Sequence, residues 1–189
     1  MKYNRIVLAS ASPRRREILA QIGLTFDVLP AQGEEVVDSV NADEVVLKLS
    51  RDKALEVSKL CDADTLVIGS DTVVALNNSI LGKPKDREEA YRMISSLRNG
   101  CHSVYTGVTI VLDEVVRSFV SETKVYVYDM TDEEIYSYID SGDCYDKAGG
   151  YGIQGLFARY VEKIDGDYLN VVGLPVSRLM QEIKKVEGL

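Results

Sequence analysis

Short apolar runs alternate along the chain with segments in which apolar residues recur every three or four positions. The first pattern is typical of buried strands, and the second of one face of a helix. Residues 5–10 predict a strand, and residues 13–22 predict a helix that Gly23 ends. Residues 25–29 predict another short strand, and residues 42–60 a second helix. This alternation favours a mixed α/β fold, and no internal repeat or linker interrupts it.

The middle of the chain continues the alternation. Residues 65–68 predict a buried strand, while residues 72–76 and 80–81 are expected to pair through a turn at 77–79. Residues 86–97 predict a helix, because an aspartate stands at the N-cap and a glutamate follows three residues later.

The C-terminal half predicts a long hairpin, two helices and a further strand pair. Thr131 and Glu134 have the spacing of a capping box at the start of the first of these helices. The predicted segments are the hairpin 104–112 with 116–128, the helix after 131, the glycine-rich loop 143–155, the strands 156–164 and 168–172, and the terminal helix 176–186.

The composition is that of a soluble globular protein, with 46% hydrophobic and 28% charged residues, and it supports one domain over residues 1–189. The 22 basic and 30 acidic residues give a net charge of −8, which argues against binding of polymeric nucleic acid but not of a small anion. Because there is no signal peptide, no membrane-length apolar run and only three dispersed cysteines, a cytoplasmic location without membrane attachment is expected.

A basic cluster, Ser10-Ala11-Ser12-Pro13-Arg14-Arg15-Arg16, follows the first predicted strand. The free backbone N–H groups and the dipole of a helix N-terminus favour an anion, whereas they disfavour arginines in the first turn. A bound phosphate would offset that conflict, because arginine grips phosphate through two parallel hydrogen bonds. The alternative is a solvated basic helix start.

Two charged residues stand at positions where buried or strand-end residues are expected. Lys53 interrupts the apolar stripe of the helix 42–60, so it either extends to the surface or points into a cleft and meets an anion. Asp71 follows the buried strand 65–68, and carboxylates at such strand ends often line active sites. Asp71 can hold a divalent metal, activate a water or simply form a turn.

Further candidates are Lys83, placed between a glycine and a proline, and the acidic pair Glu34-Glu35 near a strand end. Each alone is compatible with ordinary surface, but together with the arginines they supply cations for phosphates and carboxylates for a metal. The stretch 146–155 holds four glycines, which allow close approach of the backbone to a ligand. His102, the single histidine, has no nucleophile pattern around it, which favours a structural or surface role over a catalytic one.

Taken together, these motifs resemble the Maf family, also called septum formation inhibitor Maf, from about residue 6 to the final helix. Their order and spacing match without a large insertion. The matching pieces are Leu8-Ala9-Ser10-x-Ser12-Pro13-Arg14-Arg15, Glu35, Lys53-Ala54, Gly69-x-Asp71-Thr72, Leu81-Gly82-Lys83-Pro84, His102 to Thr106, Asp146-Lys147-Ala148-Gly149-x-Tyr151-Gly152-Ile153-Gln154-Gly155, and Gly173-Leu174-Pro175.

The resemblance implies an elongated mixed sheet flanked by helices, with two lobes and a central cleft, similar to the inosine triphosphate pyrophosphatases. It implies a nucleotide-pool house-cleaning hydrolase that cleaves a nucleoside triphosphate between the α and β phosphates, yielding the monophosphate and pyrophosphate. It also implies a requirement for Mg²⁺ or Mn²⁺ and assembly as a homodimer.

The resemblance further implies roles for particular residues. Glu35 and Asp71 would hold the metal, with Asp71 accepting the proton of the attacking water. Phosphate charge would be neutralised by four cations, and the two serines of the first motif would contact substrate. These cations and serines are Arg14, Arg15, Lys53, Lys83, Ser10 and Ser12.

Three positions bear on the choice of substrate. Arg14, Thr72 and Gln154 are similar to the branch of the family that prefers dTTP, UTP and modified pyrimidines, whereas the 7-methyl-GTP branch usually has an aromatic residue, glutamine and glutamate there. Thr72 and Gln154 would help to select the base. A glutamine amide carries a donor and an acceptor, which suits a uracil or thymine edge.

Two alternatives remain open: a cell-division regulator that binds a partner protein, and a 7-methyl-GTP pyrophosphatase. A P-loop nucleotidase is disfavoured, because the sequence has no Gly-x-x-x-x-Gly-Lys-Ser/Thr run.

Overall fold

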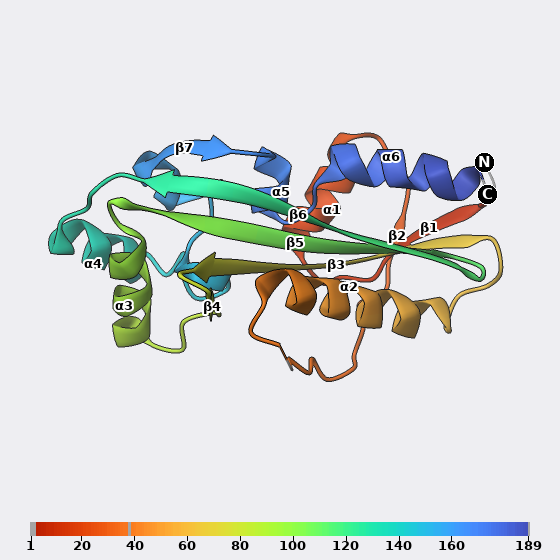
Figure 1. Cartoon of the computed structure of the whole chain (residues 1–189), viewed down its shortest axis with the longest axis horizontal. Coiled ribbons are helices and arrows are strands. Elements are labelled where there is room, and N and C mark those ends of the chain that lie inside the picture. Colours follow the sequence, from red (N-terminus) through yellow and green to blue (C-terminus); the bar gives the residue numbers. More distant parts are fainter. Residues whose placement is uncertain (1–2, 38, 189) are drawn as a thin grey trace.

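The computed structural model describes residues 3–37 and 39–188. Within them, seven strands form one open mixed sheet in the order β2-β1-β3-β5-β6-β7, and β4 pairs with β3 beside this path. The strands are β1 (Arg5–Leu8), β2 (Asp27–Val28), β3 (Thr65–Leu76), β4 (Ser79–Leu81), β5 (Gly100–Leu112), β6 (Val115–Val127) and β7 (Val161–Asp165). Figure 1 shows how far β3, β5 and β6 extend along the long axis of the molecule.

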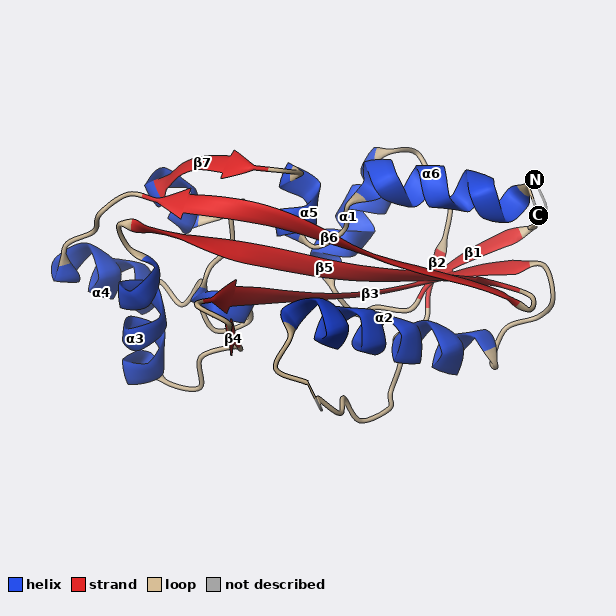
Figure 2. Cartoon of the chain, in the orientation of Figure 1, coloured by secondary structure: helices blue, strands red, loops and turns tan. Residues whose placement is uncertain are grey.

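Helices cover both faces of this sheet. They are α1 (Pro13–Gln21), α2 (Ala42–Ser58), α3 (Arg87–Leu97), α4 (Asp132–Asp140), α5 (Tyr168–Val172) and α6 (Val176–Glu187), with short 3-10 turns η1 (Ala148–Gly150) and η2 (Leu156–Tyr160). Figure 2 shows α2 on one side of the long strands, and α1, α5 and α6 on the other. The predicted α/β class with an elongated mixed sheet is therefore confirmed.

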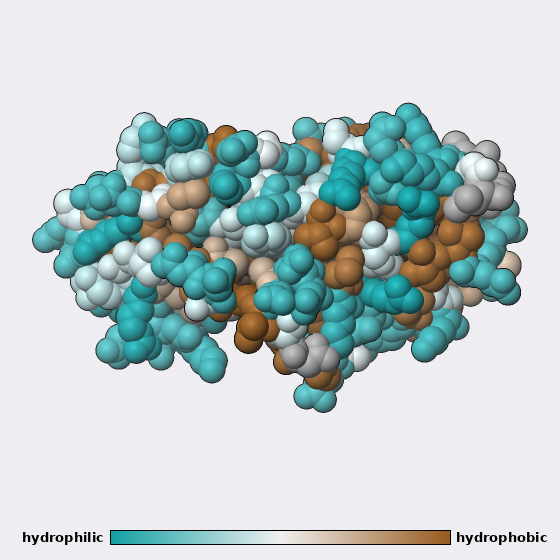
Figure 3. Space-filling model, viewed as in Figure 1, coloured by the Kyte–Doolittle hydropathy of each residue, from teal (hydrophilic) through white to brown (hydrophobic). Residues whose placement is uncertain are grey.

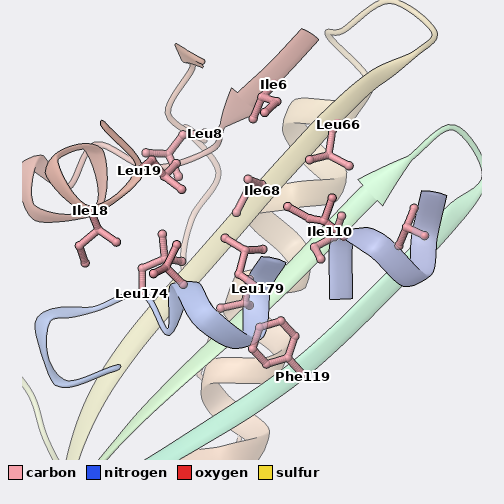
Figure 4. Close-up of a cluster of buried hydrophobic side chains, with 14 of the residues drawn as sticks. Ile6, Leu8, Ile18, Leu19, Leu66, Ile68, Ile110, Phe119, Leu174 and Leu179 are labelled. Atoms are coloured by element: carbon pink, nitrogen blue, oxygen red, sulfur yellow. The ribbon is translucent and has the colours of Figure 1, made fainter. Parts of the chain in front are cut away.

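The main core lies between the sheet and the helices α1 and α6. Figure 4 shows Leu19 of α1 beside Leu8 of β1, while Leu179 of α6 lies near Ile68 and Ile110 of the longer strands. A second core, at the other end of the sheet, packs α3 and α4 against the ends of β5 and β6. Burial of these apolar surfaces is the dominant favourable term in folding, and the two cores correspond to the two predicted lobes.

Local signals placed most helix boundaries correctly. The Asp86 side chain accepts a hydrogen bond from the Glu89 backbone N–H at 2.7 Å, which caps α3. Thr131 and Glu134 form the predicted capping box of α4. Such caps satisfy the free N–H groups of the first turn, typically worth about 1 kcal/mol each.

The predicted strands 65–68 and 72–76 are one continuous strand, β3. The glycine and polar residues at 69–71 predict a break after the first apolar run. They remain extended because β5 pairs with them in register, Gly69 opposite Thr109 and Asp71 opposite Gly107. Pairing with a neighbouring strand thus outweighed the local turn signal.

The predicted strand pair at 156–164 and 168–172 is wrong in most of its length. Residues 156–160 form the 3-10 turn η2, and only β7 is a strand, paired with β6. The second segment is the helix α5, because the side chain of Asp167 accepts a hydrogen bond from the Leu169 N–H at 2.8 Å and starts a helical turn.

Two glycines let α2 lie directly on the sheet. A Cβ atom at Gly107 would overlap the backbone carbonyl of Val46, and one at Gly69 would overlap the carbonyl of Ser50. Glycine is therefore required for close approach at both positions rather than for an unusual φ. This approach places α2 within side-chain reach of Asp71 on β3, where Lys53 meets it.

Gly107→Ala is expected to lower the free energy of unfolding by about 3 kcal/mol, because the added methyl group meets helix backbone that cannot give way. Urea denaturation measures the change. Gly82→Ala is the matched control, since a Cβ there has no heavy atom within 4 Å, and a change below about 0.5 kcal/mol is expected. Equal stability of the Gly107→Ala variant and the wild type would contradict this account of the packing.

Among the helices formed by residues 3–37 and 39–188, none is long and apolar enough to cross a membrane. Figure 3 shows one face, on which hydrophilic residues predominate and hydrophobic ones form separate patches.

Candidate active site

The site lies along a free stretch of the β3 edge. β1 pairs with β3 as far as Ile68, and β4 pairs with it from Val74 onward, so in the described structure residues 69–73 have no strand neighbour on this side. A cavity of about 1160 Å³ opens there. All ten residues implicated by the family resemblance line it, namely Ser10, Ser12, Arg14, Arg15, Glu35, Lys53, Asp71, Thr72, Lys83 and Gln154.

Lys53 joins the two predicted metal-binding carboxylates. Its Nζ lies 2.7 Å from Glu35 Oε1 and 2.5 Å from Asp71 Oδ1. Only 17% of the Lys53 side chain is exposed, so it points into the cleft and does not extend to the surface. The hydrogen bond from Lys53, aided by the positive charges of Lys83 and Arg15, holds the pKa of Glu35 below its usual value.

The same geometry suits a divalent cation. The carboxylates of Glu35 and Asp71 converge on one positive centre, which is the Lys53 ammonium. No group of three or more His, Cys, Asp or Glu side chains able to hold a metal occurs in residues 3–37 and 39–188. Two carboxylates are nevertheless an adequate protein donor set for Mg²⁺, which usually keeps waters and binds substrate phosphates as well. The residues present therefore fit such an ion.

Arg15 is a buried cation with neutral hydrogen-bond partners. Its Nε donates to the Gly173 carbonyl (2.9 Å), its Nη1 to Ser10 Oγ (2.9 Å) and its Nη2 to Thr72 Oγ1 (3.1 Å). No ion pair to a carboxylate is formed by Arg15 within the described residues. Burial lowers the pKa of its guanidinium, and the negative charge of Asp71 partly offsets this. Such a charge is suited to hold an anion in the cleft.

Arg14 connects the start of α1 to the glycine-rich loop. Its Nη1 lies 3.2 Å from Asp146 Oδ2, and the other oxygen of Asp146 accepts from Lys147 Nζ at 2.6 Å. The Lys147 ammonium also contacts Asp143 Oδ1 at 2.9 Å. Asp146 and Lys147 line the cavity. Their role cannot be recognised in the sequence, because a charged pair inside a glycine-rich loop carries no specific signal by itself.

The remaining predicted residues are more open to solvent. Lys83 and Gln154 are exposed at the cavity wall. Ser12 occupies the N-cap position of α1 as expected, but its side chain makes no capping hydrogen bond. Ser10, in contrast, is buried, and its hydroxyl accepts from both Arg15 and the Ser12 N–H.

Part of the cavity wall is apolar, a feature that the sequence motifs do not predict. The loop before α2 contributes Val37 and Val40, which are 57% and 79% exposed. Helix α2 and strands β3 and β4 supply further apolar residues, namely Val45, Leu49, Val73, Ile80 and Leu81. A cavity with charged and apolar walls suits a ligand that has both an anionic part and a flat organic ring.

His102 lies outside this cavity, in the second core. The ring is 3% exposed, and its Nε2 lies 2.6 Å from the hydroxyl of Tyr151. This placement agrees with the structural role expected for the single histidine. Burial lowers the pKa of His102 from 6.5 to about 4, because the charged ring would lose its hydration.

The stability contributed by neutral His102 is therefore present above pH 6.5 and is lost as the pH falls towards 4. We expect the stability advantage of the wild type over His102→Gln to shrink by about 3 kcal/mol across this range. Urea denaturation of both proteins at a series of pH values measures the difference. A constant difference would show that protonation of His102 is not the cause.

Comparisons with known proteins agree with these features. The family model described as Maf-like protein matches residues 5–186. The dTTP/UTP pyrophosphatase of Agathobacter rectalis is 52% identical over 200 residues, covering 97% of this chain and 98% of the relative. The dTTP/UTP pyrophosphatase of Bacillus anthracis is 41% identical over 182 residues, which cover 96% of this chain and 95% of the relative. A human protein, named a probable bifunctional dTTP/UTP pyrophosphatase/methyltransferase, is 42% identical, with 97% of this chain matching 32% of its length.

Proposed function

The chain belongs to the Maf family, and from this premise we propose that it hydrolyses dTTP and UTP to the nucleoside monophosphate and pyrophosphate. Full-length relatives with this activity in their names support the proposal. The structural observation that carries it is the placement of Lys53 between Glu35 and Asp71, in the cavity that also holds Arg15, whose hydrogen bonds go to neutral groups. Such a site can hold a triphosphate and deliver a water to it.

In the proposed reaction, a water oxygen attacks the α phosphorus, and the bond from that phosphorus to the bridging oxygen breaks. Pyrophosphate leaves with the electron pair of that bond, and Asp71 accepts the proton of the water. The phosphate oxygens are held by four cations in the cavity, which stabilise the charge that develops on them. These cations are Arg14, Arg15, Lys53 and Lys83.

We propose that Glu35 and Asp71 hold a Mg²⁺ or Mn²⁺ ion. When bound, this ion would neutralise phosphate charge and lower the pKa of a coordinated water. Lys53 would compete with this ion for the two carboxylates, since its ammonium contacts one oxygen of each.

Preference for a pyrimidine base is assigned to Gln154, because its exposed amide at the cavity wall offers one donor group and one acceptor. Modified pyrimidine nucleotides carry the same donor and acceptor edge and remain in the proposed substrate class.

We also propose that the protein is a cytoplasmic homodimer, as the family resemblance implies. Light scattering coupled to size-exclusion chromatography tests the assembly, with a mass near twice 21.0 kDa expected.

The deciding experiment is pyrophosphate release from dTTP, UTP, CTP, 7-methyl-GTP and ATP, with Mg²⁺ or Mn²⁺ and with EDTA. Turnover of dTTP and UTP that EDTA abolishes would support the substrate, the reaction and the metal together. Turnover of 7-methyl-GTP alone would support the proposed hydrolysis to monophosphate and pyrophosphate but contradict the preference for a pyrimidine base. Absence of turnover with every nucleotide would instead favour a protein-binding regulator.

A further inference from the structure

Thr72 and Thr106 form a hydroxyl pair behind Arg15. The two residues lie directly opposite each other on β3 and β5, and their Oγ1 atoms are 2.9 Å apart. Thr106 is completely buried, and its Oγ1 donates to the carbonyl of Asn170 in α5 at 3.0 Å. Hydrogen bonds therefore run from the guanidinium at the cavity to the backbone of the buried Asn170 in α5.

The hydrogen bonds show to which acceptor each of these two hydroxyl groups donates its single proton. Thr106 has one hydroxyl proton and gives it to Asn170, so Thr106 can only accept from Thr72. Thr72 thus gives its own proton to Thr106, while it accepts a hydrogen bond from Arg15 Nη2 at 3.1 Å. The other available acceptor, the Gly173 carbonyl, is more distant, at 3.5 Å. Hence Thr72 has no proton left to donate to a base.

The carbonyl of Gly173 also helps to hold the Arg15 side chain in place. Its carbonyl accepts from Arg15 Nε at 2.9 Å and from Ser70 Oγ at 3.3 Å. This carbonyl is aimed at Arg15 by a backbone with φ of 128°, a conformation that favours glycine. Arg15 therefore donates hydrogen bonds to three neutral groups, and within the described residues it forms no ion pair with a carboxylate.

We infer that Thr72 and Thr106 are positioning residues, which orient the Arg15 guanidinium toward the phosphates, so that position 72 acts on phosphate binding through Arg15. The inference rests on the proposed triphosphate hydrolysis, in which Arg15 binds phosphate. It assigns a role to Thr106, a residue of the family motif without a role in the proposed reaction.

The test uses a ligand that has phosphates but no base. Calorimetry measures the Kd of inorganic tripolyphosphate in EDTA for the wild type, Thr72→Val and Thr106→Val. Valine keeps the shape of threonine and removes the hydroxyl. We expect about tenfold weaker binding for Thr72→Val, which deprives Arg15 of an acceptor, and about threefold for Thr106→Val, which acts through Thr72. Thr72→Ser, which keeps the hydroxyl, should restore binding to within about twofold.

Steady-state kinetics provides the second measurement. If Thr72 orients Arg15, kcat/KM for dTTP, UTP and 7-methyl-GTP falls by a similar factor in Thr72→Val, and the preference among them is unchanged. A changed preference together with unchanged tripolyphosphate binding would overturn the inference, because it would show that Thr72 contacts the base.

Thr109→Val is the matched control. Thr109 lies on β5, as Thr106 does, and the two residues are equally buried. The hydroxyl of Thr109, however, forms hydrogen bonds with Ser50 and Ser118, away from the cavity. Equal loss of tripolyphosphate binding in this variant would overturn the inference, as would absence of binding by the wild type. If the wild type binds tripolyphosphate but hydrolyses no nucleotide, the proposed function fails, while the calorimetric comparison still decides the roles of Thr72 and Thr106.

Discussion

Asp71→Asn is expected to lower kcat for dTTP by about 10³-fold, because the amide cannot accept the proton of the attacking water. The substitution keeps the size of the side chain, and the amide oxygen can still accept a hydrogen bond from Lys53. It also removes one of the two negative charges that we propose for metal binding. Single-turnover kinetics at saturating nucleotide and metal measures the effect on the chemical step.

Asp52→Asn is the control for this substitution. Asp52 lies one position before Lys53 in α2, but its carboxylate is 57% exposed and pairs with Lys48. Its kcat should stay within about twofold of the wild type, as expected for a surface carboxylate remote from the chemistry. Near-normal turnover by Asp71→Asn would remove Asp71 from the role of base and leave water activation to another group.

Lys53→Met is expected to produce two opposite effects. It should lower kcat/KM by about 10²-fold, because a cation that offsets phosphate charge in the transition state is lost. It should also tighten binding of Mn²⁺ to the nucleotide-free protein by about tenfold, because Lys53 no longer competes for the carboxylates of Glu35 and Asp71. Titration of free Mn²⁺ by electron paramagnetic resonance measures the second effect without any turnover.

Lys59→Met removes the same charge from the exposed C-cap of α2 and serves as the control, with no change expected in either measurement. Unchanged or weaker Mn²⁺ binding by Lys53→Met would show that the ammonium and the metal do not share a position. The combination of lost activity and tighter metal binding distinguishes competition from a general disturbance of the site.

The residues of the site were predictable because they occur in an ordered set of motifs, although each motif alone was ambiguous. Lys53 illustrates the ambiguity: a lysine on an apolar stripe is compatible with surface or cleft. The structure decides between them, since Gly69 and Gly107 bring α2 close enough for Lys53 to reach Asp71. No local pattern gives that helix-to-sheet distance.

The sequence by itself determined the fold class, most helix boundaries and the chemical identity of the site residues. Capping and apolar spacing act over a few residues, so they can be recognised in a single segment. The tertiary structure decided what depends on distant partners. β5 kept residues 69–71 extended, and a turn at Asp167 made a helix of an apolar segment that resembles a strand. It also gave Arg15 hydrogen bonds to neutral groups and joined the hydroxyl of Thr72 to that of Thr106, because strand pairing and helix packing bring together residues far apart in the chain.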